Sequence, residues 1–523
     1  MTRNLITPYS LKIAVLGAGT MGSGIALTIL LADLPVCLYD VSPDMLSGAR
    51  EYIQKHLERK GKGNNLAELQ LTTDLSNLSG ADILIEAVPE NLALKQQLFT
   101  QVETLCPPPA ILATNTSTLS VTAIASGTSS PERVGGMHFF NPAPLMPLVE
   151  VVRGAQTNPE TLQALVALAE KLGKTRVVAN DTPGFIVNRL ARPFYGEALR
   201  LLGEQVASPQ QIDQIVRLGA GFRMGPFELM DLIGLDINLA ATQSMYEQTF
   251  GEPRYRPHPI QMRIVQQKTL GRKTGQGFYR YDQGDRQEAA QPPELKSYRD
   301  PLYLSPGSWT PGLFQLARQA GCLIVSGRLA REANFALAIA SASRQEGLSR
   351  QLVELDQALP AHVPILCQCA DVSLGEAAAW IHHPERLVGF DGLFFARGRA
   401  ACLVAGPTLM PQARRLVEDF ASSLGRLPVW IQDSPSLVLP RLIAMLANEA
   451  AFAVLEGVAE PDRIDLAMQL GLNYPKGPLA WAGEIGYANL IAILDHLQAE
   501  YGEERYRACT LLRRWARLKL INA

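Results

Sequence analysis

Residues 11–40 read LKIAVLGAGTMGSGIALTILLADLPVCLYD, and this stretch decides the fold class of the first part of the chain. An apolar run of strand length comes first, at 11–16. A glycine-rich turn, an apolar helical stretch and a second strand-like run that ends at Asp40 follow it. The order strand, glycine turn, helix, strand is typical of the opening of a doubly wound α/β domain.

The following residues repeat this alternation of strands and helices. Strands are predicted at 81–90, 110–117, 133–140, 148–154 and 175–181, and helices at 43–60, 91–105 and 159–172. Strands that alternate with helices predict a parallel sheet covered on both faces, here as a Rossmann-like domain over 1–183. After Pro183 the apolar residues take helical spacing, which predicts an all-α domain over 184–285.

Bulk composition excludes several classes of protein. The 523 residues are too many for one core, and 48 basic against 50 acidic residues give a net charge of −2. No basic field for nucleic acid or an anionic membrane is expected. No apolar stretch is long enough to span a bilayer and no signal region is evident, so the expected compartment is the cytoplasm. The seven scattered cysteines indicate reduced core thiols, and no metal site is predicted.

The glycine turn predicts a dinucleotide site. Gly17 permits the tight turn, Gly19 lets the backbone approach a pyrophosphate, and Gly22 lets helix and strand pack closely. The turn Gly17-Ala18-Gly19-Thr20-Met21-Gly22 opens a helix, whose free N–H groups favour phosphate. Asp40 stands 23 residues beyond Gly17, where a carboxylate accepts hydrogen bonds from the ribose diol and repels a 2′-phosphate. NAD is therefore the expected cofactor.

The rest of the chain repeats the first part. Five residues recur at a constant offset of 252: Asp181, Pro183, Arg189, Glu197 and Asp213 reappear as Asp433, Pro435, Arg441, Glu449 and Asp465. We interpret this as an internal duplication. It predicts a linker over 286–312, a degenerate and truncated Rossmann-like domain over 313–429, and a second helical domain over 430–523.

Oxidation of an alcohol requires a base for the hydroxyl proton, and a histidine held by a carboxylate suits this role. His138 is the one histidine at a strand end of the first α/β layer, and Glu150 lies on the next predicted strand. Taken alone, His138 would more often be a structural residue.

A resemblance strengthens the catalytic reading. The chain resembles the 3-hydroxyacyl-CoA dehydrogenase family over residues 11–281. The resemblance rests on GAGTMGSGIA, EAVPE at 86–90, NTS at 115–117, HFFNP at 138–142, LVEVV at 148–152, DTPGFIVNR at 181–189, Gly225-Pro226, Asp231 and GRKTGQGFY at 271–279. The whole layout is similar to the two-copy bacterial members of phenylacetate catabolism, which act on 3-hydroxyadipyl-CoA or 3-hydroxybutyryl-CoA.

The resemblance implies roles for particular residues. His138 would be the general base, Glu150 would orient it, and Ser117 and Asn188 would bind the reacting end of an acyl-CoA substrate. Four further residues match family positions around NAD: Glu90, Lys95, Asn115 and Lys273. The acyl-CoA would lie between the first two domains. The segment 43–73 departs from the family, because it is shorter than the CoA-contacting helical hairpin at this place in the family. Lys60 and Lys62 in this segment are candidates for contacts to the CoA phosphates, and a solvated loop without such contacts is an equal alternative.

The second copy lacks the catalytic set. In the repeat register Ser117 falls on Asp371, His138 on Asp391, Glu150 on about Cys402 and Asn188 on Pro440. We therefore expect residues 430–523 to act as a built-in pseudo-dimer partner of 184–281, with a further homo-oligomer left open. Two alternatives are kept: a hydroxyacid dehydrogenase of related fold, which would use a lysine base on the helical domain, and a non-catalytic NAD-binding protein.

Overall fold

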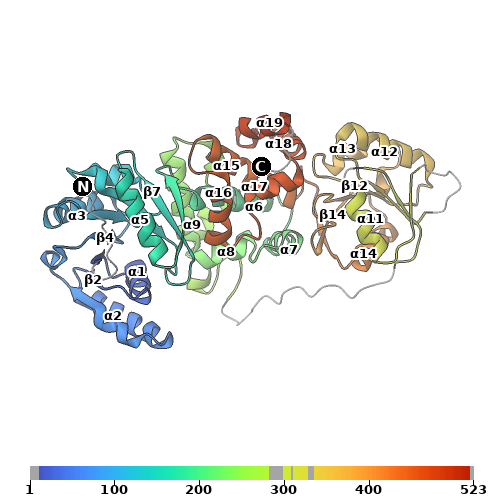
Figure 1. Cartoon of the computed structure of the whole chain (residues 1–523). Coiled ribbons are helices and arrows are strands. Elements are labelled where there is room, and N and C mark those ends of the chain that lie inside the picture. The colour runs from blue at the N-terminus through green and yellow to red at the C-terminus, as the bar shows by residue number, and fades with distance from the viewer. Residues whose placement is uncertain (1–10, 282–297, 308–309, 328–334, 407, 519–523) are drawn as a thin grey trace. The chain divides into compact units, whose positions relative to one another are not determined.

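The computed structural model describes residues 11–281, 298–307, 310–327, 335–406 and 408–518 (Figure 1). The predictions for the first ten residues and for most of the linker fall outside these ranges. The chain forms two compact units. The first runs to Arg189 and includes Ala453–Gly477, and the second comprises Leu190–Phe452 and the chain from Pro478 onward.

The first unit is built on an eight-stranded sheet of order β3-β2-β1-β4-β5-β6-β7-β8. Its strands are β1 Ile13–Leu16, β2 Val36–Tyr39, β3 Leu69–Thr72, β4 Ile83–Glu86, β5 Ile111–Thr114, β6 Val134–Phe139, β7 Leu148–Arg153 and β8 Thr175–Asn180. Its helices are α1 Thr20–Leu31, α2 Pro43–Arg59, α3 Leu92–Leu105, α4 Val121–Ala125 and α5 Pro159–Lys171. The sheet confirms the predicted Rossmann-like class.

Helix α1 is apolar on nearly all sides because it is covered on nearly all sides. Ile25, Leu27 and Ile29 are buried in one cluster with strand residues such as Val15 and Leu38. Helices α1 and α5 pack on the sheet (Figure 1). Burial of such side chains stabilises the domain by roughly 1.5–3 kcal/mol each.

Two details of the first sheet differ from the prediction. Strand β3 was not expected, because its four residues give too short a periodic signal. The sheet is also not wholly parallel, since β6 and β7 pair antiparallel. Only residues 140–147 connect them, too few for the crossover that a parallel pair requires. This antiparallel pair sets His138 directly opposite Glu150.

A second sheet, in the second unit, has the order β10-β9-β11-β12-β13-β14-β15. Its strands are β9 Leu302–Leu304, β10 Ile324–Ser326, β11 Leu337–Ala340, β12 Ile365–Gln368, β13 Leu387–Phe390, β14 Ala400–Ala405 and β15 Leu427–Ile431. Its helices are α11 Thr310–Gln319, α12 Gln345–Ala358, α13 Leu374–Ala378 and α14 Pro411–Ser423. Its order repeats that of the first sheet without a counterpart of β3 among the described residues.

Strand β9 lies inside the segment 286–312 that we predicted as a linker. Its three residues are too few to show a period, and prolines flank them. After β9, Gly307 lies so close to β11 that a Cβ on it would stand 2.7 Å from the Ser341 carbonyl oxygen. Gly17 has the same relation to Ala87 in the first sheet. One glycine of the turn thus persists in the second copy, whereas the full glycine pattern is absent, as the sequence indicated.

The helical parts of the two copies pack together within the second unit. The helices are α6 Val187–Gly203, α7 Pro209–Ala220, α8 Pro226–Ile233, α9 Leu235–Gln248, α10 Pro259–Gln266, α15 Leu439–Leu455, α17 Pro478–Ile485, α18 Tyr487–Tyr501 and α19 Thr510–Arg517. Arg441 of α15 is fully buried and donates to Glu197 of α6 at 2.8 Å and to Glu204 at 2.8 and 3.0 Å. In the same way Arg254 donates to the buried Glu449 at 2.9 Å. Removing one partner of such a buried pair destabilises a fold by about 3–5 kcal/mol.

One helix of the second copy belongs to the first unit. Helix α16, Pro461–Leu472, packs on β7 and β8, and a Cβ on Gly471 would lie 2.9 Å from Val187 and 3.1 Å from Leu148. The backbone N–H of Asn180 donates to the backbone carbonyl of Val458 at 2.9 Å. The strand that carries Glu150 is therefore covered by a helix more than 300 residues away in sequence.

No helix among the described residues is long and apolar enough to cross a membrane. The seven cysteines are all free thiols, six of them buried.

Candidate active site

The glycine turn forms a cradle at the N-terminus of α1. Gly17 has φ +102°, and a Cβ on Gly22 would lie 1.7 Å from the Gly17 carbonyl oxygen, so only glycine fits there. Gly19 has no heavy atom within 4 Å of the place where a Cβ would stand, which leaves its face open. Thr20 and Met21 begin the helix, and no side chain caps it. Open backbone N–H groups at a helix N-terminus fit the pyrophosphate of a dinucleotide.

Asp40 closes this cradle at the end of β2. Its carboxylate accepts hydrogen bonds from the N–H groups of Ala18 at 2.7 Å and Ser42 at 2.9 Å. The side chain is thus fixed against the glycine turn rather than free to move. A negative charge fixed here suits a ribose diol and opposes a phosphorylated ribose.

His138 and Glu150 form a hydrogen-bonded pair. His138 Nδ1 lies 2.7 Å from Glu150 Oε2, and both side chains are buried. The other carboxylate oxygen accepts from the N–H groups of Ile186 at 3.1 Å and Val187 at 3.0 Å. The positive φ of Gly184, +73°, and of Phe185, +49°, turns the chain so that these two N–H groups point at Glu150. Glu150 therefore ties the histidine to the start of α6.

Aromatic rings border this histidine. The centroid of Phe140 lies 4.5 Å from that of the imidazole, and the centroid of Phe185 lies 6.0 Å away. An apolar surround with one carboxylate at Nδ1 holds the ring in one orientation and leaves Nε2 for another partner.

Ser117 lies beside Asn188 and Glu90. The Asn188 side-chain amide donates to the Ser117 carbonyl at 3.1 Å. Glu90 accepts from the Ser117 N–H at 2.8 Å and from its hydroxyl at 3.2 Å. In the same region, the side-chain oxygen of Asn115 accepts a hydrogen bond from the Phe139 N–H at 2.8 Å. The residues that follow β4 and β5 are thus hydrogen-bonded to one another and to the last residue of β6, at the carboxyl ends of these strands.

Lys95 is buried and does not face solvent. Its ammonium lies 2.7 Å from Glu86 and 3.1 Å from Glu90. Burial raises the pKa of the Glu86 carboxyl, although Lys95 opposes the rise. Burial acts on Glu90 in the same direction, but Lys95 and the Ser117 and Thr116 donors outweigh it and lower its pKa. Glu86, which sequence reasoning did not select, is therefore the anchor of Lys95.

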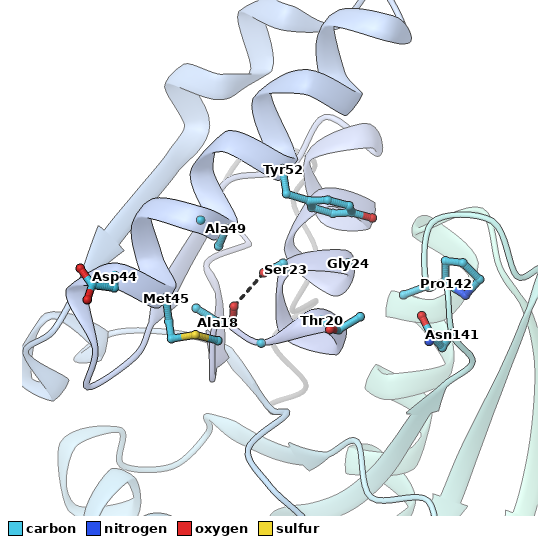
Figure 2. Close-up of a pocket in the computed structure, with 13 residues that line it drawn as sticks. Ala18, Thr20, Ser23, Gly24, Asp44, Met45, Ala49, Tyr52, Asn141 and Pro142 are labelled. Atoms are coloured by element: carbon cyan, nitrogen blue, oxygen red, sulfur yellow. Dashed lines mark hydrogen bonds between the residues drawn. The ribbon is translucent and has the colours of Figure 1, made fainter. Parts of the chain in front are cut away.

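A pocket opens beside the glycine turn (Figure 2). It has a volume of about 280 Å³ and is lined by the start of α1, by α2 and by the loop after β6. Met45, Gly48 and Tyr52 line it from α2, and Asn141 and Pro142 line it from the loop. Sequence reasoning missed the α2 residues, because nothing in their pattern separates a pocket wall from an ordinary amphipathic helix.

Other candidate cations are already engaged. Lys62 donates to the Leu31 carbonyl at 2.7 Å and pairs with Asp33 at 2.8 Å. Lys273 belongs to the second unit, where it pairs with Asp236 at 2.6 Å.

The corresponding place in the second copy has become structural. The Asp391 N–H donates to the Cys402 carbonyl at 3.3 Å, so these residues face each other as His138 and Glu150 do. The Asp391 carboxylate accepts from the N–H groups of Leu393 and Phe394, both at 3.0 Å. Burial raises the pKa of Asp391 to about 7. This carboxyl stabilises a turn, and it stands where the first copy has the imidazole of His138.

Two family models match the chain. The family model described as 3-hydroxyacyl-CoA dehydrogenase, NAD binding domain, matches residues 12–182. The model for the C-terminal domain of the same enzymes matches residues 184–281 and, a second time, 437–522. The chain therefore belongs to the 3-hydroxyacyl-CoA dehydrogenase family, as an NAD-dependent enzyme with a duplicated C-terminal domain.

Individual relatives match either the first half or nearly all of the chain. The chain is 38% identical to the 3-hydroxyadipyl-CoA dehydrogenase of Escherichia coli, over 97% of this chain and 98% of that protein. It is 42% identical to a probable 3-hydroxybutyryl-CoA dehydrogenase of Bacillus subtilis, over 52% of this chain and 98% of that protein. The crystal structure of a 3-hydroxybutyryl-CoA dehydrogenase from E. coli matches with a TM-score of 0.80 and 37% identity, over 97% of this chain and 98% of the other.

Proposed function

We propose that the chain oxidises (S)-3-hydroxyacyl-CoA to 3-oxoacyl-CoA at His138 and catalyses the reverse reduction. The observation that supports this most directly is the 2.7 Å contact between His138 Nδ1 and Glu150 Oε2. With Nδ1–H donated to the carboxylate, Nε2 carries a lone pair and can take the proton of the 3-hydroxyl group. Bound NAD supplies the hydride acceptor. Glu150 stabilises the imidazolium that the proton transfer creates.

Ser117 and Asn188 position the substrate in this proposal. In support of this, the Asn188 side-chain amide donates to the Ser117 backbone carbonyl at 3.1 Å, and Ser117 follows β5, the strand next to the one that carries His138. Hydrogen-bond donors fixed in this way hold a reacting oxygen and stabilise the charge that develops on it.

The cofactor role extends over the predicted residues of the first unit. Gly17, Gly19 and Gly22 shape the pyrophosphate cradle, and Asp40 sets the preference for NAD over NADP. In this proposal Glu90 and Asn115 contact the cofactor, while the buried Lys95 acts through Glu90, from which its ammonium lies 3.1 Å away. The role of Lys273 rests on the resemblance alone.

The pocket beside the glycine turn suits the pantetheine arm of CoA. Its charged lining residue is Asp44, and its lining contains no lysine or arginine among the described residues. A carboxylate without a cation disfavours phosphate groups, whereas an uncharged chain with two amides fits a wall of mixed polarity.

The acyl group is proposed to be short. The full-length relative is named for 3-hydroxyadipyl-CoA and the matching crystal structure for 3-hydroxybutyryl-CoA, which points to phenylacetate-type or fatty-acid-type catabolism. A dicarboxylic acyl group would require a cation for its distal carboxylate. Arg254 is paired with Glu449, and Arg192 is buried with Thr242 as an acceptor at 2.7 Å. Arg223 is exposed.

The second helical copy is proposed to act as an internal partner of the first. The buried ion pairs of Arg441 and Arg254 join the two copies, and α16 covers β7. These contacts support a stability role for the second copy rather than a second catalytic one.

The test of the function is His138→Gln, assayed by NADH formation with 3-hydroxybutyryl-CoA, 3-hydroxyadipyl-CoA and a long-chain substrate. We expect kcat to fall by at least about 100-fold with NAD binding retained, since the base is removed and the cradle is untouched. The matched control is His362→Gln, an exposed site in the second copy. Near-normal turnover of His138→Gln would refute the mechanism, and the ratio of rates on the three substrates would assign the acyl group.

A further inference from the structure

Three potential metal ligands meet in the second copy, away from the site described above. Glu376, His496 and Glu500 each direct one ligand atom to a common place, with all three atoms within 4.8 Å of one another. Glu376 comes from α13 and the other two come from α18, all in the second unit. Two carboxylates and one imidazole leave a local charge of −2, which a divalent cation would neutralise.

His496 supplies the observation that points to a ligand. Its side chain is only 5% exposed, and its Nε2 atom has no hydrogen-bond partner among the described residues. The nearest carboxylate oxygen, Glu376 Oε2, lies 3.6 Å away, too far for a hydrogen bond. A buried polar atom without a hydrogen-bond partner is unfavourable, so an imidazole nitrogen beside two carboxylates calls for a ligand that satisfies all three groups.

The supporting structure holds these ligands in place. His496 and Glu500 are four residues apart on α18, and therefore project from the same face of the helix. Glu376 occupies the third position of α13, where the N–H and the hydroxyl of Ser373 donate to its Oε2 at 2.7 and 2.9 Å. Hydrogen bonds of this kind orient a carboxylate before a metal binds.

The duplication provides a comparison within the same chain. Ser120 and Ser373 cap matching helices, which shifts the register of the repeat by one residue after Ser117, so Glu376 stands in the place of Ala123. At the offset of 252, His496 replaces Ser244 and Glu500 replaces Gln248. None of the three first-copy residues carries a charge or an imidazole. The ligand set is thus a property of the second copy and not a remnant of the dehydrogenase site.

We propose that Glu376, His496 and Glu500 bind one Zn²⁺ ion that fastens α13 to α18. The imidazole favours zinc over magnesium or calcium, which prefer oxygen ligands alone. Three protein ligands leave one position of a tetrahedral zinc for water, so the site is more open than a zinc site with four protein ligands. The ion joins the second α/β sheet region to the second helical region and stabilises the copy that has lost its chemistry. This structural role goes beyond the dehydrogenase activity.

The test uses the full-length chain after dialysis against a chelator. Zinc chloride is titrated in competition with a chromophoric chelator, and thermal unfolding is followed with and without zinc. We expect one high-affinity equivalent and a higher Tm with zinc for the parent chain. Glu500→Gln should weaken binding by at least about tenfold, and His496→Gln should abolish both effects. Glu504→Gln, an exposed acid just beyond α18, is the matched control and should bind as the parent does.

Two readouts separate this site from others in the chain. Cobalt in place of zinc should give visible bands without the near-ultraviolet charge-transfer band of a thiolate ligand, because no cysteine belongs to the set. Dehydrogenase turnover should be the same in all variants at a temperature where each is folded. The proposal is overturned if the parent chain binds no zinc, if Glu500→Gln and His496→Gln bind as tightly as it does, or if cobalt reports a cysteine ligand.

Discussion

Replacement of Glu150 by glutamine is the sharpest test of how the histidine is set up. Glu150 Oε1 accepts from the N–H groups of Ile186 and Val187, while Oε2 faces His138 Nδ1 at 2.7 Å. A glutamine has one acceptor and one donor end, so it cannot satisfy both sides. If its amide oxygen faces the two N–H groups, its NH₂ group faces Nδ1. The imidazole must then carry its proton on Nε2, the atom that has to act as the base.

The magnitude follows from the two orientations. If the NH₂ group of the glutamine faced the backbone instead, two buried N–H groups would lack an acceptor, at about 1–3 kcal/mol each. The orientation with the amide oxygen toward these N–H groups is therefore preferred. A base in the wrong tautomer loses its contribution of about 10²–10⁴ in rate. At 1.36 kcal/mol for each factor of ten, this is a loss of about 3–5 kcal/mol in transition-state stabilisation.

The assay compares kcat for Glu150→Gln and the parent chain at saturating NAD and 3-hydroxyacyl-CoA, with calorimetric titration of NAD alongside. We expect kcat to fall by a factor of about 10²–10⁴. The affinity for NAD should be retained, because Asp40 and the glycine turn are unchanged. Glu160→Gln makes the same substitution at an exposed site of the same unit and serves as the control. A kcat for Glu150→Gln within a factor of about ten of the parent would show that Glu150 does not set the tautomer of His138.

Four further perturbations test other parts of the argument. Gly48→Phe should raise KM for acyl-CoA by about tenfold or more with little change in kcat, since a Cβ at Gly48 meets nothing within 4 Å and the ring would fill the pocket. Gly48→Ala, which adds only a methyl group, is the control for this variant. A rise in KM for NAD without a rise in KM for acyl-CoA would assign the pocket to the cofactor. Asp40→Ala should relax the preference for NAD over NADP by at least about tenfold, because it removes a charge that repels the 2′-phosphate; unchanged discrimination would contradict that role. Asp391→Asn should stabilise the chain at alkaline pH. Burial raises the pKa of Asp391 from 3.8 to about 7, so the parent chain loses stability as pH rises between these values, by up to about 4 kcal/mol. Thermal unfolding of the parent chain and of Asp391→Asn at pH 5 and pH 8 measures this loss of stability. The same Tm difference between the two chains at both pH values would contradict the prediction. A fragment ending at residue 285 lacks α16 and Arg441 and should be poorly soluble or inactive, whereas a stable and fully active fragment would refute the internal-partner proposal.

Most of the first sheet could be predicted from the sequence, because its strands and helices carry clear periods. The failures occurred where the local signal was short. Strand β3 has four residues and β9 has three, and pairing with neighbours in the sheet rather than propensity makes them strands. The antiparallel pairing of β6 and β7 follows from an eight-residue connection, a constraint that the strand pattern does not show.

The sequence by itself determined the family, the cofactor and the duplication. These depend on residue types at fixed spacings, such as the glycine turn and the constant offset between copies. Only the tertiary structure decided which groups meet. It placed Glu150 between His138 and two backbone N–H groups and buried Lys95 between Glu86 and Glu90. It also laid α16 of the second copy on the strand that carries Glu150. Contacts between residues far apart in sequence have no local signature, because burial and pairing are settled only when distant segments pack.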